Sequence, residues 1–148
     1  MLSALALVAG LTIAPQTVTP PSAPQTLAGL ATATPAPDCG GMREDMGDTG
    51  SMQCVTAPLG QISDLALTLA AEARSNGWTV AGGGANALWM TKPSTNGRCD
   101  RMTIIGFWNF RTYPEPRAGV PGYVGVMVEP DQSCEAPAAD TSSPPTAQ

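Results

Sequence analysis

The chain has 148 residues, a net charge of −5 and no histidine, so it lacks the commonest general base and the commonest metal ligand. Residues 59–128 hold six basic and four acidic side chains, a balance of +2, so the rest of the chain carries −7. Acidic flanks disfavour nucleic-acid binding, and we expect a non-catalytic protein without a cofactor or a metal.

The N-terminal part of the chain predicts export. Residues 1–14 are apolar and uncharged, and they are too short for a membrane span, which needs about 20 residues. They have the length of a signal-peptide core, although no basic residue precedes them. Six prolines follow in residues 15–37. We therefore interpret residues 1–33 as a signal-like segment and a Pro/Ala/Thr-rich linker of a periplasmic or secreted protein; an apolar cytosolic N-terminus is the alternative.

The central part of the chain predicts one helix followed by strands. Apolar residues from Ile62 to Ala73 recur with a helical period, which predicts a helix over about residues 58–75. Residues 78–81 and 87–91 flank three glycines and favour a β-hairpin. Residues 102–110 are typical of a central strand, residues 111–122 of a loop, and residues 123–129 of a half-buried strand.

These elements predict an α+β domain. Short connections favour a mainly antiparallel sheet of three to four strands with the amphipathic helix packed on one face. We place this single domain at residues 38–134, with its core at residues 59–128. The tail, residues 135–148, is rich in proline and small residues and is expected to be disordered.

Four cysteines predict two disulfides, because an even number in an exported chain favours a disulfide framework. They are Cys39, Cys54, Cys99 and Cys134, which allow three pairings. We prefer the sequential pairing, because each bridge then spans neighbouring elements: Cys39–Cys54 closes a short lobe before the helix, and Cys99–Cys134 ties the turn before the central strand to the chain just beyond the last strand. No C-x-x-C motif occurs, which disfavours a zinc site or a redox dithiol.

Two other patterns resemble ligand sites only superficially. Glu44, Asp45 and Asp48 lie on a glycine-containing loop, but their spacing differs from that of a calcium-binding loop. The three glycines at 82–84 precede a strand-like segment, whereas a phosphate loop opens onto a helix. We expect a solvated loop and a hairpin turn.

The aromatic residues give the candidate binding surface. All seven lie between positions 78 and 123, and the neighbours Phe107 and Trp108 must point to opposite faces of their strand. If Phe107 faces the helix, Trp108 lies on the other face; alternatively, a lobe formed by residues 38–54 covers that second face. Tryptophan, tyrosine and arginine dominate binding hot spots. The predicted binding residues are Trp108, Phe110, Arg111 and Tyr113.

These observations favour a non-catalytic domain that binds or supports an envelope or extracellular partner, a protein or a glycan. A self-associating surface component is one alternative. A small hydrolase with paired carboxylates is another, although Glu72, Asp100, Glu115 and Glu129 are dispersed in the sequence. No nucleic-acid partner is expected.

Overall fold

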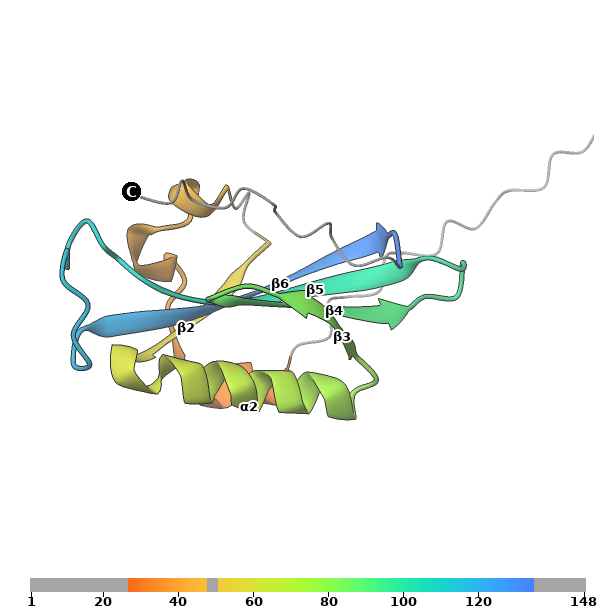
Figure 1. Ribbon diagram of the computed structural model, residues 1–148, viewed down its shortest axis with the longest axis horizontal. Coiled ribbons are helices and arrows are strands. Elements are labelled where there is room, and N and C mark those ends of the chain that lie inside the picture. Colours follow the sequence, from red (N-terminus) through yellow and green to blue (C-terminus); the bar gives the residue numbers. More distant parts are fainter. Residues whose placement is uncertain (1–26, 48–50, 135–148) are drawn as a thin grey trace, which may run out of the picture.

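The computed structural model of the chain describes residues 27–47 and 51–134, and a six-stranded antiparallel sheet forms its centre (Figure 1). The spatial order of the strands is β1-β2-β6-β5-β4-β3. The strands are β1 (Thr34–Pro35), β2 (Gln53–Pro58), β3 (Thr79–Gly83), β4 (Ala87–Pro93), β5 (Cys99–Trp108) and β6 (Pro121–Gln132). The helices are α1 (Ala28–Thr32) and α2 (Ile62–Ser75), with the short 3-10 turns η1 (Cys39–Gly41), η2 (Glu44–Met46) and η3 (Leu59–Gln61).

The predicted α+β class is confirmed, but the sheet is larger than the predicted three to four strands. The expected strands correspond to β3, β4, β5 and β6, and the sequence analysis missed β1 and β2. β2 pairs with β6, more than 60 residues later in the chain. Its sequence, QCVTAP, has only two β-branched residues and ends in proline, so it carries little local strand signal.

α2 forms where the apolar period predicts a helix, and its last turn shows why it ends. Gly77 has a φ of +85°, a conformation that glycine adopts without steric cost. Its N–H donates to the carbonyl of Arg74 (3.0 Å), and the N–H of Trp78 donates to that of Ala73 (3.1 Å). This is the Schellman arrangement, and it turns the chain into β3.

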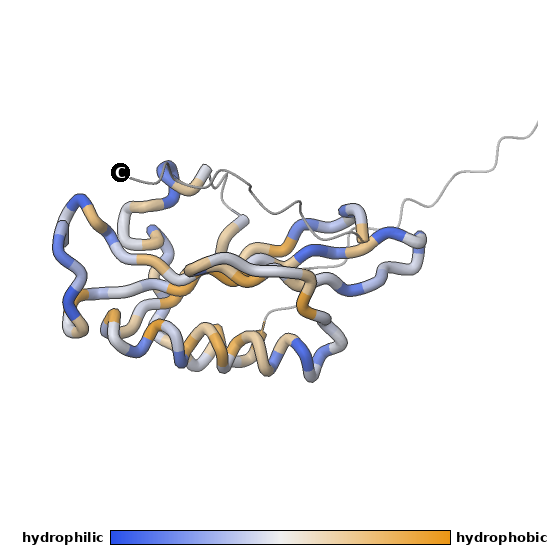
Figure 2. Tube along the Cα trace, viewed as in Figure 1, coloured by the Kyte–Doolittle hydropathy of each residue, from blue (hydrophilic) through white to orange (hydrophobic). Residues whose placement is uncertain are grey.

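The main core lies between the sheet and the two α-helices. Leu69 of α2, Met102 and Ile104 of β5 and Val124 of β6 are almost completely buried there. Hydrophobic segments accordingly gather along α2 and the middle of the sheet, whereas hydrophilic ones occupy the ends (Figure 2). No helix within the described ranges is long and apolar enough to cross a membrane.

The core extends beyond the boundaries expected from the sequence. Leu27 and Leu30, in the segment interpreted as linker, are buried against α2. Glu72 of α2 accepts hydrogen bonds from the N–H groups of Ala28 and Gly29, which holds the first turn of α1. The rest of the signal-like segment and linker, residues 1–26, and the predicted tail, residues 135–148, lie outside the described residues.

A second, smaller core covers the opposite face of the sheet. The N-terminal lobe, residues 36–47 and 51–54, lies over β5 and β6 on the side away from α2 (Figure 1). Its buried residues Met42 and Met52 pack with Phe107. The Cys39–Cys54 disulfide ties this lobe to β2, and Cys99–Cys134 joins the start of β5 to the chain beyond β6. The two disulfides are therefore the preferred sequential pair.

Candidate functional site

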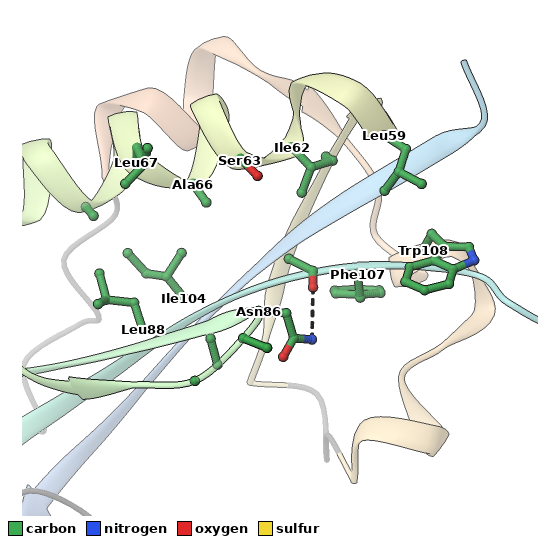
Figure 3. A pocket seen from close by; sticks show the side chains of 15 residues that line it. Leu59, Ile62, Ser63, Ala66, Leu67, Asn86, Leu88, Ile104, Phe107 and Trp108 are labelled. Carbon is green, nitrogen blue, oxygen red and sulfur yellow. Dashed lines mark hydrogen bonds between the residues drawn. The ribbon is translucent and has the colours of Figure 1, made fainter. Parts of the chain in front are cut away.

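An apolar cleft lies between α2 and the side of the sheet formed by β4 and β5 (Figure 3). Its volume is about 450 Å³, within the usual range of small-ligand sites. We call it the α2–β4 cleft. Its lining comes from η3, α2, the β3–β4 turn, β4 and β5: Leu59, Ile62, Ser63, Ala66, Leu67, Ala70, Gly84, Ala85, Asn86, Ala87, Leu88, Ile104, Gly106, Phe107 and Trp108.

The cleft results from the way α2 sits on the sheet. α2 contacts β5, β6 and β2, so the β3–β4 hairpin is left beside it. Gly122 lets the start of the helix approach closely, because a Cβ there would lie 2.4 Å from Cγ1 of Ile62. A Cβ on Gly106 would lie 2.9 Å from Cγ2 of the same residue. These contacts fix Ile62 against β5 and β6, and the cleft opens along the neighbouring flank of the helix.

Among the described residues that line the cleft none is charged, and few are polar. The Ser63 hydroxyl points toward it from α2, and Asn86 lies on the opposite side (Figure 3). The side-chain amide of Asn86 donates to the backbone carbonyl of Gly106 (3.1 Å). The backbone N–H of Gly106 donates in turn to the backbone carbonyl of Asn86 (2.8 Å). Leu67, at the edge of the cleft, is 62% exposed. The arrangement can bind an apolar group mainly by removing apolar surface from water.

Of the four predicted binding residues, Trp108 ends β5 and lines the cleft, whereas Phe110, Arg111 and Tyr113 follow in the β5–β6 connection and are not part of the lining. Trp108 contributes its ring to the cleft, and its indole N–H donates to the carbonyl of Tyr113 (3.0 Å). Phe110 is 52% exposed. Arg111 forms an ion pair with Asp45 of the N-terminal lobe. Two of the four side chains, Trp108 and Tyr113, are half-buried, and the other two are exposed.

Asn109 organises this connection, and the sequence analysis did not single it out. Its side-chain oxygen accepts from the N–H groups of Arg111 (3.0 Å) and Thr112 (2.9 Å). Its amide donates to the carbonyl of Gly40 in the N-terminal lobe (2.8 Å). Asparagine commonly caps its own turn in this way, and its position between an aromatic strand and a loop was the available signal.

The two neighbouring aromatic residues point to opposite faces, as expected, but Phe107 points away from the helix. It faces the N-terminal lobe and stacks on Tyr123, with ring centroids 5.6 Å apart. Trp108 lies on the helix side. The lobe therefore covers Phe107, and the face away from the helix carries Phe107 instead of Trp108. Burial raises the pKa of Tyr123, and the Asp38 carboxylate adds to this effect.

The other candidate ligands are engaged or dispersed. Asp45 is paired with Arg111, Glu44 lies in the same lobe, and Asp48 is outside the described residues. In the described part of the chain, no three acidic or cysteine residues are grouped as metal ligands would be. Of the dispersed carboxylates, Glu72 holds α1 and Glu115 pairs with Arg117 (2.7 Å).

Comparisons with protein-family models, with curated proteins and with solved structures find no match to this chain. The cleft-lining residues of α2 and of the β3–β4 turn were not among the predicted site residues. One signal for them was present: Leu67 is a large apolar residue outside the helical stripe that predicted the buried face.

Proposed function

We propose that this chain is an exported, non-catalytic binding domain that holds an apolar group of its partner in the α2–β4 cleft. The observation that carries the proposal is the uncharged, apolar lining of a cleft of about 450 Å³. The apolar side chains of an open cleft remain exposed to water, so the folded protein gives up the stabilisation that their burial would provide. The described lining residues carry no carboxylate, amine or thiol, so their chemistry favours binding over acid–base or nucleophilic catalysis.

The β5–β6 connection supports binding at the same site. Trp108 joins the cleft to this connection, because its ring lines the cleft while its N–H holds Tyr113. The hydrogen bonds of Asn109 and the Arg111–Asp45 pair order the segment before any partner arrives. A preordered segment loses less conformational entropy on binding. We infer that Phe110 and Arg111 form the rim of the contact surface.

The two disulfides are compatible with an oxidising extracellular compartment, and together with the apolar segment at residues 1–14 they support a periplasmic or secreted location. Subcellular fractionation, followed by mass spectrometry of the N-terminal peptide, tests this part of the proposal. A cytosolic protein that retains residues 1–14 would contradict it.

Binding at the cleft is tested with Nile red, a neutral dye that fluoresces in apolar surroundings. Ala66→Phe fills the cleft from α2 and should abolish the dye signal. Ala71→Phe is the matched control, because Ala71 is exposed and does not line the cleft. Circular dichroism in the near ultraviolet establishes that both variants remain folded. Equal dye binding by a folded Ala66→Phe variant and the wild type would contradict the proposed site.

A further inference from the structure

The lining of the cleft extends along α2. Along α2 its lining runs from Ile62 to Ala70, a separation of eight positions, which corresponds to about 12 Å of helix. Leu59 and Trp108 lie at one end, and Leu67 and Leu88 lie toward the other (Figure 3). A trough of this shape matches an extended aliphatic chain.

The three charged residues of α2 are divided between its flanks. Glu72 is turned toward α1, where it accepts the hydrogen bonds of the Ala28 and Gly29 N–H groups. Asp64 lines a different groove, with residues of α1 and β1. Both carboxylates are thus kept away from the cleft lining.

Arg74 lies on the other flank. With Ser63, Leu67 and Ala70 it follows the spacing i, i+4, i+7 and i+11, which is one stripe of an α-helix. Arg74 is exposed and follows Ala70, the last cleft-lining residue of α2, by one helical turn. The stripe of α2 that carries the uncharged cleft lining therefore continues, one turn further, to a cation.

We propose that the ligand of the α2–β4 cleft is a single-chain anionic amphiphile, with its aliphatic chain along α2 and its anionic head beside Arg74. This inference rests on the proposed function and adds the class of ligand. The apolar lining accepts the chain without burying a charge, and the head stays in water next to a cation. An anionic head at the opposite flank would instead meet Asp64.

The test measures calorimetric binding of dodecanoate and of dodecan-1-ol, each below its aggregation concentration. Both have the same chain, and only dodecanoate carries a charge. An exposed ion pair contributes about 0.2–1 kcal/mol, so the wild type should prefer dodecanoate by up to about fivefold. Arg74→Gln should remove this preference without changing dodecan-1-ol binding. Arg117→Gln removes a positive charge from the β5–β6 loop and should keep the preference.

Equal affinity of the wild type for the two compounds would overturn the assignment of the head group. Dodecanoate binding that persists in a folded Ala66→Phe variant would overturn the cleft as the site of the chain. Binding to anionic phospholipid vesicles without binding of monomeric dodecanoate would also overturn the inference, in favour of a bilayer surface. Cleft-dependent Nile red binding without dodecanoate binding would leave the proposed function standing, whereas loss of both would refute both.

Discussion

Two leucines of α2, two positions apart, allow a quantitative test of how the helix is seated. Leu69 is completely buried between α1 and the sheet, whereas Leu67 is 62% exposed. Leu69→Ala deletes three buried carbon groups, which at roughly 0.8 kcal/mol each amounts to about 2.4 kcal/mol before any cavity is counted. The backbone of Gly29 lies so close that a Cβ there would be 2.9 Å from Cδ2 of Leu69. Since the surroundings are tightly packed and can collapse only in part, we expect a total loss of ~3–4 kcal/mol.

Equilibrium unfolding in urea, without reductant, measures this loss. With an m-value of about 1.5 kcal/mol per molar urea, the Leu69→Ala midpoint should fall by about 2–2.7 M. Leu67→Ala is the control and should change the free energy of unfolding by no more than about 0.5 kcal/mol. If Leu67→Ala proved as destabilising as Leu69→Ala, the buried face of α2 would be assigned to the wrong stripe.

Four further outcomes are expected. Thiol titration of denatured, unreduced protein should find no reactive cysteine, since all four are paired; several reactive thiols would contradict the disulfide framework. Gly40→Ala should lower the free energy of unfolding by more than the ~1–2 kcal/mol that a left-handed alanine costs, because its Cβ would also lie 2.3 Å from the Tyr123 ring. Gly47 has a similar φ but no atom within 4 Å of the Cβ position, so Gly47→Ala should lose only the ~1–2 kcal/mol of the backbone. Burial raises the pKa of Tyr123, so the midpoint of its titration, followed by ultraviolet absorbance, should lie above about pH 10. The contribution of this shift to the free energy of unfolding is complete below about pH 10 and should be lost as the pH rises through the pKa of the folded state. Trp108→Ala with Arg111→Ala should weaken Nile red binding while unfolding stays cooperative; a protein that simply unfolds would show that Trp108 is core.

The elements that the sequence predicted are those with a local pattern. α2 has a helical apolar stripe and a glycine stop, and β5 and β6 have the composition of buried strands, so each can be recognised without knowing its neighbours. β2 is different, because it becomes a strand by pairing with β6. β1 has only two residues and depends in turn on β2. Short strands held by distant partners leave little trace in their own sequence.

The site was predictable only in part for a related reason. Strand alternation requires Phe107 and Trp108 to face opposite sides, but it does not determine which side meets the helix. That choice depends on Gly106 and Gly122, whose missing side chains make room for Ile62 on the face that Trp108 shares. Phe107 is thereby directed to the N-terminal lobe, where Tyr123 stacks on it. The contact between Ile62 and the two glycines joins three distant segments and cannot be read from any one of them.

The cleft follows from the unequal cover of the two ends of the sheet. Six strands spaced about 4.8 Å apart span roughly 24 Å, whereas one helix with its side chains covers about 10 Å. α2 covers β2, β6 and β5, and the five-residue α1 packs beside it on the β2 side. No second long helix within the described ranges lies beside α2 to cover β4 and β3. The apolar side chains of β4 and α2 that such a helix would bury, Leu88 and Leu67 among them, instead line an open cleft. The same shortage of cover that lowers the burial of this small domain therefore creates its best candidate for a binding site.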